Sequence, residues 1–273
     1  MSRTAHRYVK RGLHSVHGWL NPVSGQVISA VSEVQREFGV VGSSAEIGVH
    51  HGKLMLLLML LNPDQAAYAI DIFDRQDLNI DHSGKGNKAI FLRHVDKIVG
   101  PHDLRIIEDS SMNVTVDQLS MPARLFSVDG GHTVECTMHD LRLAAESLTD
   151  GGIIILDDAF NEAWPEVADG LSRYLSANPK VVPFALSPNK VYLTQLNWCD
   201  RYRASLRANM PKLFDRSLRV FGTEVDIYGV SAASRDYAVY AAHAINRIRG
   251  IAARLIPAFV GVVGALRTDL PIT

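Results

Sequence analysis

The stretch ARLFSVDGGHTVECTMHDLRLAAESLTDGGIIILDDAF, residues 123–160, decides the fold. It holds two short apolar runs, at 125–128 and 153–156. Between them, residues 134–148 have apolar side chains at helical spacing and lead into a glycine pair. This pattern predicts a strand, a helix and a second strand, which together make the right-handed βαβ unit of a parallel sheet.

Both apolar runs end in acid. Asp129 follows the first run, and Asp157 and Asp158 follow the second. Because the two strands are parallel, these acids emerge at the same carboxyl edge, where open α/β sheets bind ligands. His132 lies three residues after Asp129. Three carboxylates beside an imidazole predict a hard-metal and base site at this edge.

Composition excludes several other classes of protein. The 273 residues are 47% hydrophobic and 21% charged, as in an ordinary globular chain. The formal net charge of -1 gives no reason to expect a nucleic-acid partner. Cys136 and Cys199 form no paired motif, so we expect neither a disulfide framework nor a zinc site, and a reducing cytoplasm fits. No run of about 18 apolar residues predicts a membrane span.

The patterning predicts three regions. They are N-terminal helices over 1–38, a ligand-binding domain over 39–197 and a helical appendage over 198–273. Arginine-rich amphipathic helices are expected at 201–218 and 236–256, which we interpret as packing or homo-oligomer elements. The apolar segment 251–266 could lie on a membrane surface, although burial between subunits explains it equally well.

Further strands are predicted inside the middle region. They are expected at 45–49, 67–70 and 104–107, with an antiparallel hairpin over 181–186 and 190–195. The polar stretch 73–87 has no periodicity and is long for a connection, which favours a mobile lid over a site.

A glycine-bounded turn, AEIGVHHG at 45–52, follows the first of these strands. It lacks the spacing of a phosphate-binding loop and of the dinucleotide fingerprint. His50 and His51 are expected to contribute backbone rather than ligands. Asp71 ends the next strand, where an acid accepts the hydroxyls of a ribose. Because the turn has no diphosphate-binding pattern, the best nucleoside ligand is S-adenosylmethionine. The acidic Glu46 would attract the ammonium group of this cofactor.

In order, the segments AEIGVHHG, AIDIF, IIEDSS, FSVDGGHT and GGIIILDD resemble the class I S-adenosylmethionine-dependent O-methyltransferases. They are most similar to the metal-dependent branch that includes catechol-type and sugar or macrolide enzymes. The resemblance spans about residues 40–195. It implies an α/β, Rossmann-like, mostly parallel sheet of seven strands with an antiparallel C-terminal hairpin and helices on both faces.

The resemblance also implies roles for individual residues. Those implied to bind the cofactor are Glu46, Gly48 and Gly52 at the methionine part, Asp71 at the ribose, Asp109 and Ser110 at the adenine, and Asp129. Those implied to hold Mg²⁺ or a similar ion are Asp129, Asp157 and Asp158. His132 stands where this branch places its general base. Leu54 replaces a serine of catechol-type enzymes, and the Asp-Asp pair departs from the usual Asp-Asn or Glu-Asp.

The expected reaction is methyl transfer to a hydroxyl of a small molecule such as a sugar, a glycolipid head or a natural product. A metal that lowers the pKa of the hydroxyl suits such a poor nucleophile. Two rival functions remain: a nicotinamide-dependent oxidoreductase, and a non-catalytic nucleoside-binding or assembly protein. Singly, Asp129 and Asp157 could be helix caps, His132 could cap its helix, and Glu46 could be a buried structural acid.

Overall fold

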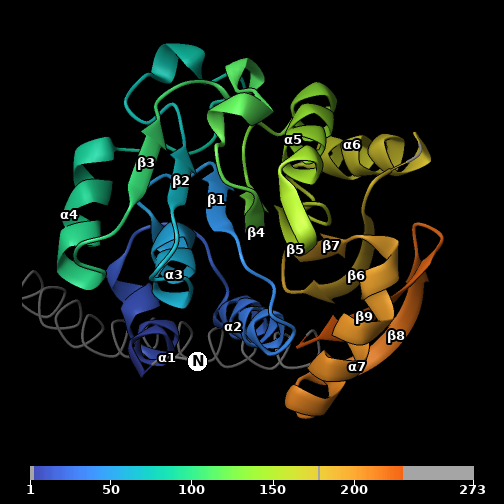
Figure 1. Ribbon diagram of the computed structural model, residues 1–273. Coiled ribbons are helices and arrows are strands. Elements are labelled where there is room, and N and C mark those ends of the chain that lie inside the picture. The colour runs from blue at the N-terminus through green and yellow to red at the C-terminus, as the bar shows by residue number, and fades with distance from the viewer. Residues whose placement is uncertain (1–2, 178, 230–273) are drawn as a thin grey trace, which may run out of the picture. The chain divides into compact units, whose positions relative to one another are not determined.

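The computed structural model describes residues 3–177 and 179–229. Within these ranges a nine-stranded sheet runs in the order β3-β2-β1-β4-β5-β7-β6-β9-β8 (Figure 1). Its strands are β1 (Ser43–Ile47), β2 (Ala67–Ile70), β3 (Leu104–Ile107), β4 (Ala123–Val128), β5 (Leu148–Asp157), β6 (Val182–Ser187), β7 (Lys190–Thr194), β8 (Phe214–Val220) and β9 (Thr223–Tyr228). Strands β1 to β5 are mutually parallel, and β7 is antiparallel to both of its neighbours.

Helices cover both faces of the sheet. They are α1 (Arg3–Lys10), α2 (Pro22–Glu37), α3 (Lys53–Leu61), α4 (Lys88–Ile98), α5 (Val134–Glu146), α6 (Pro165–Ser176) and α7 (Cys199–Asn209). One apolar core lies under α1, α2, α3, α4 and α7, and a second lies under α5 and α6 (Figure 1). Every residue of α3 after Lys53 is buried, as its wholly apolar sequence predicts. The predicted α/β class, with helices on both faces, is confirmed.

The sheet carries two more strands than the seven predicted. The helix expected at 201–218 is wrong beyond Asn209, because β8 begins at Phe214 and pairs with β9. The arginines that suggested the polar face of a helix instead donate hydrogen bonds to a buried carboxylate. Asp226 in β9 is fully buried and accepts hydrogen bonds from Arg203 and Arg207. The predicted helical appendage therefore fails over 210–229.

At the N-terminus the structure differs from the prediction, and the last predicted segments lie outside the described residues. Of the N-terminal helices expected over 1–38, the first ends at Lys10, and a 3-10 turn (Gly12–Ser15) separates it from α2. The segments 236–256 and 251–266, and with them the predicted homo-oligomer and membrane contacts, lie outside the described residues. In the part of the chain that is described, no helix is both long and apolar enough to cross a membrane.

A buried arginine fastens α2 and α3 to the sheet. Arg124 in β4 is 2% exposed. Its guanidinium donates to the side chains of Asn62, Ser32 and Gln35 and to the Leu61 carbonyl. Burial lowers the pKa of Arg124 to about 10, so the group stays charged at neutral pH. Five donors matched by helix-end acceptors make this contact specific in orientation.

Candidate active site

The strand order reverses between β1 and β4, and a cavity of about 430 Å³ opens at the carboxyl edge there. Open α/β sheets bind ligands at such a switch point. The volume suits a small molecule. Of the predicted site residues, the lining includes Gly48, Asp71, Asp109, Ser110, Asp129, His132, Asp157 and Asp158. The structure thus brings eight residues from five segments of the chain to one cavity.

The glycine turn after β1 places backbone directly against β4. Gly48 has φ +83°, and a Cβ there would lie 1.7 Å from the carbonyl oxygen of Asp129. Gly52 has φ +90°, and a Cβ there would strike the ring of Phe91. Only glycine fits these positions. Gly48 lines the cavity, whereas Gly52 begins α3 outside the lining.

Glu46 lies apart from the cavity that it was predicted to border. It is 2% exposed, is absent from the lining, and its Oε2 lacks a hydrogen-bond partner among the described residues. Burial raises the pKa of Glu46 well above its usual range, although the Lys190 ammonium opposes this. Because Glu46 is buried and outside the cavity lining, its position fits the structural alternative.

Asp71 ends β2 inside the cavity. Its carboxylate accepts the backbone N–H groups of His50, at 2.7 Å, and of Phe73. Burial raises the pKa of Asp71, and these backbone hydrogen bonds oppose the rise. A carboxylate has about four acceptor positions, so capacity remains for ribose hydroxyls.

Asp109 and Ser110 follow β3 on the same cavity. The Asp109 carboxylate accepts hydrogen bonds from Asn113 Nδ2, at 3.0 Å, and from the Ser110 backbone. These hydrogen bonds lower the pKa of Asp109. Both residues line the cavity, and their role beside the adenine stays a prediction.

Asp157 is engaged by a buried lysine. The hairpin register pairs Asp157 with Lys190, which is 3% exposed, and the Lys190 ammonium contacts the Asp157 carboxylate. Lys190 Nζ also lies 3.9 Å from Asp129. Burial alone would lower the pKa of Lys190, but Asp157 and Asp129 outweigh it and raise that pKa. Asn189 Nδ2 donates to Asp157 at 2.7 Å. Asp157 is therefore neutralised within the protein.

Asp158 is the acid that faces His132. His132 Nε2 lies 3.2 Å from Asp158 Oδ2, and Asn161 and Asn189 donate to Oδ1. Burial alone would raise the pKa of Asp158, but these hydrogen bonds outweigh it and lower the pKa to about 2. Asp158 has φ +60°, an uncommon backbone conformation for a non-glycine residue. The carboxylate stays ionised and turned toward the imidazole.

A second acid, which sequence reasoning missed, holds the other side of His132. Asp81, in the predicted lid, accepts from the His132 backbone at 2.8 Å and lies 2.7 Å from Nδ1. The Trp164 ring stacks on the imidazole at 4.1 Å. Burial alone would lower the pKa of His132, but hydrogen bonds to Asp158 and Asp81 outweigh it and raise that pKa. No local pattern marks Asp81, since only the folded lid brings it to His132.

The donor set fits a divalent ion in part. Asp129, His132 and Asp158 each offer a ligand atom within 4.8 Å of the others. Burial and the neighbouring Asp157 raise the pKa of Asp129 well above its usual range, against the Lys190 ammonium. A cation would relieve that crowding of carboxyl groups. Asp157, predicted as a ligand, already has Lys190 as its counter-ion.

The fold and part of the sequence are similar to those of methyltransferases. Residues 45–159 match a family model described as "Methyltransferase domain". A cofactor-bound structure of Rv0187 from MTB shares the fold with a TM-score of 0.52 at 11% identity, over 71% of this chain and 90% of that one. Two further solved structures resemble this chain at lower TM-scores. A putative O-methyltransferase from Klebsiella pneumoniae gives 0.49 at 15% identity over 71% and 90% of the two chains, and CalS11, a TDP-rhamnose 3'-O-methyltransferase, gives 0.48 at 18% over 70% and 92%.

The comparison with curated proteins finds no match. The family match covers the glycine turn, Asp71 and both of the strands that are followed by acids. The match therefore assigns a methyltransferase domain to residues 45–159, and the chain is an enzyme.

Proposed function

We propose that this enzyme transfers a methyl group from S-adenosylmethionine to a hydroxyl of a small molecule, such as a sugar, a glycolipid head or a natural product, with the help of a divalent ion. One observation carries the proposal: the ribose acid Asp71 and the group formed by His132, Asp158 and Asp129 line the same cavity. A cofactor site that adjoins a base and two carboxylates suits transfer to an oxygen acceptor.

The cavity divides between cofactor and acceptor. Gly48, Asp71, Asp109 and Ser110 would hold the cofactor. Asp129 and Asp158 would hold Mg²⁺ or a similar ion, which commonly binds through one or two carboxylates and keeps exchangeable waters. When bound, the cofactor supplies an activated methyl group and the ion lowers the pKa of the acceptor hydroxyl. A pair of adjacent oxygens, as in a vicinal diol or a catechol, would chelate such an ion.

His132 is the proposed general base. Asp81 would keep the proton of the neutral imidazole on Nδ1, which leaves Nε2 as the atom that accepts a proton. Trp164 fixes the ring plane by stacking. Because the pKa of His132 is raised, the neutral base forms above the ordinary pKa of histidine. Asp81 and Trp164 act as positioning residues.

The test is methyl transfer from radiolabelled S-adenosylmethionine to a panel of sugars, nucleotide sugars, glycolipids and catechols. Product should form with Mg²⁺ present and should be lost after chelation. Asp158→Asn should lower kcat by at least about 10-fold, since mutation of even the outer partners of metal ligands typically costs about 10- to 100-fold. Asp169→Asn, at an exposed ion pair with Arg173, is the matched control and should leave kcat unchanged.

The atom of the product that carries the label shows whether the methyl group was transferred to oxygen. A methyl ether would support the proposal. Label found only on nitrogen or carbon would overturn the O-methyltransferase assignment, and turnover that survives chelation would overturn the role of the ion. The cytoplasm is the compartment that we propose, since both cysteines are buried free thiols.

A further inference from the structure

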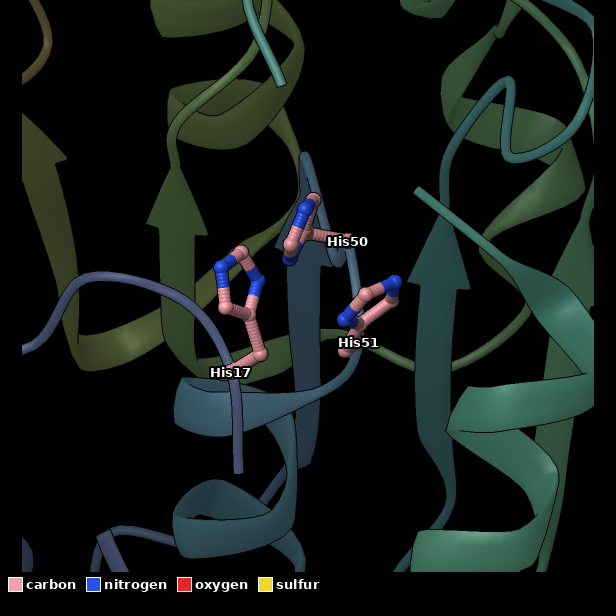
Figure 2. Close-up of side chains that lie close together, drawn as sticks. All are labelled: His17, His50 and His51. Carbon is pink, nitrogen blue, oxygen red and sulfur yellow. The ribbon is translucent and has the colours of Figure 1, made fainter. Parts of the chain in front are cut away.

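Three histidines meet beside the mouth of the cavity, at a place separate from the carboxylate group. His17 comes from the segment after the 3-10 turn, and His50 and His51 belong to the turn between β1 and α3. Figure 2 shows the three rings facing one another, each with a nitrogen turned toward the space between them. One nitrogen from each ring lies within 4.8 Å of the others.

The backbone holds this arrangement in place. His50 has φ +54°, a conformation that non-glycine residues seldom adopt and that often marks a functional site. It lets the adjacent rings of His50 and His51 pack on one side, with centroids 4.0 Å apart. Lys53 Nζ donates to the Gly18 carbonyl at 2.6 Å, which ties the segment of His17 to the same turn.

Two of these rings present buried nitrogens without a partner. Nδ1 of His50 and Nδ1 of His51 have no hydrogen-bond partner among the described residues. Such atoms are rare in folded proteins, because an unpaired buried polar atom costs about 1–3 kcal/mol. Burial lowers the pKa of His50 to about 4 and also lowers that of His51. A lowered pKa favours the neutral imidazole, which is the form that binds metal ions.

Outer contacts fix the turn as they do around metal-binding histidines. His94 Nδ1 lies 2.9 Å from the carbonyl oxygen of His51, and the backbone N–H of His50 donates to Asp71 at 2.7 Å. These contacts orient the turn and leave Nδ1 of His50 and Nδ1 of His51 without a partner among the described residues.

We propose that His17, His50 and His51 form a binding site for a divalent transition metal ion, with Zn²⁺ the best fit. Three imidazoles suit Zn²⁺ and leave its fourth tetrahedral position for water. The absence of oxygen ligands disfavours Mg²⁺, which separates this site from the carboxylate group. The ion would join the segment of His17 to the glycine turn beside the ribose acid. His50 and the neighbouring Trp19 line the cavity, so the ion would stabilise the cavity mouth.

The site is tested by titrating the full chain with Zn²⁺, in excess Mg²⁺, against a chromophoric chelator, and with Co²⁺ followed by visible absorption. The wild type should bind one Zn²⁺ at this site, and bound Co²⁺ should show the intense spectrum of a tetrahedral site. His17→Gln should weaken binding by at least about 10-fold and abolish that spectrum, since it removes one of three ligands.

Two further variants separate this site from its neighbours. His14→Gln changes an exposed histidine of the same segment and should bind Zn²⁺ as the wild type does. Asp158→Asn disables the carboxylate group and should also leave Zn²⁺ affinity unchanged. Equal affinity in His17→Gln and wild type, or binding that disappears in Asp158→Asn, would overturn the proposal. Equal melting temperatures of metal-free His17→Gln and wild type show that the variant is folded.

Discussion

Replacing Asp81 by Asn tests whether the enzyme depends on an oriented imidazole. The variant keeps the shape of the side chain and removes the charge that faces His132 Nδ1 at 2.7 Å. The side chains of His132 and Asp81 are only 10% and 11% exposed, so water replaces the lost carboxylate poorly. The proton of the neutral ring would then be free to occupy Nε2, the atom that must accept. General-base catalysis supplies about 100- to 10,000-fold in rate, and we expect kcat to fall within that range.

The structure also gives the size of the stability effect. The pKa of Asp81 falls from its ordinary 3.8 to about 2; burial alone would raise it, but hydrogen bonds from Ser83 and His132 outweigh burial. At 1.36 kcal/mol per pKa unit this is worth about 2 kcal/mol, and solvent screening of a partly exposed group reduces it to about 1 kcal/mol. That contribution is present above pH 3.8 and is lost as the pH falls through about 2. Urea unfolding of Asp81→Asn at pH 7 should show a loss of this size.

Activity against pH supplies the decisive readout. The pKa of His132 is raised, so its ion pairs are complete below pH 6.5 and are lost as the pH rises through the raised value. The wild-type rate should therefore increase with pH through a pKa above 6.5. In Asp81→Asn that limb should move to lower pH, because one of two flanking carboxylates is gone. Asp77→Asn, an exposed acid of the same lid, is the control. A kcat within about threefold of wild type and an unmoved limb would refute the positioning role.

Three further substitutions test the scaffold. Arg124→Met should lower the free energy of unfolding by about 3 kcal/mol in urea titration, because it leaves several buried acceptors without donors. The control Arg173→Met, at an exposed ion pair, should lower it by under about 1 kcal/mol. Gly48→Ala should cost more than about 3 kcal/mol by thermal unfolding, since its Cβ would overlap the Asp129 carbonyl; Gly100→Ala has the same φ of +83° in open space and should cost only about 1 kcal/mol. Lys190→Met should destabilise by about 3–5 kcal/mol at pH 7 in urea titration, because it leaves the buried Asp157 carboxylate without its counter-ion. An unchanged free energy of unfolding would count against the ion pair.

The predictable part of the fold is the part built from buried parallel strands. Such strands are continuous apolar runs, and each of the first five was recognised from its own residues. Helix α3 was equally clear, because the eight successive apolar residues after Lys53 leave only burial as an explanation. Strands β8 and β9 were missed because charged residues obscure the alternation of apolar and polar side chains in them. Asp226 is buried only because Arg203 and Arg207 reach it from α7.

The site was predictable to the extent that strand ends carry it. Asp71, Asp129 and Asp158 each follow a strand, so topology alone brings them to one edge. Asp81 and Lys190 could not be predicted in the same way, since a lid turn and a hairpin register put them there. The cluster of three histidines could not be predicted from the sequence either. His50 and His51 were expected to contribute only backbone, and His17 lies more than thirty residues earlier in the chain.

The most direct test of the central claim is calorimetric titration with S-adenosylhomocysteine, with Mg²⁺ present and again after chelation. We expect micromolar binding at one site per chain that is lost in Asp71→Ala, because the ribose loses its acceptor. Asp74→Ala, a nearby exposed acid outside the cavity lining, should bind as the wild type does. Absence of binding under both conditions, or undiminished binding by Asp71→Ala, would contradict the assignment of this cavity as the cofactor site.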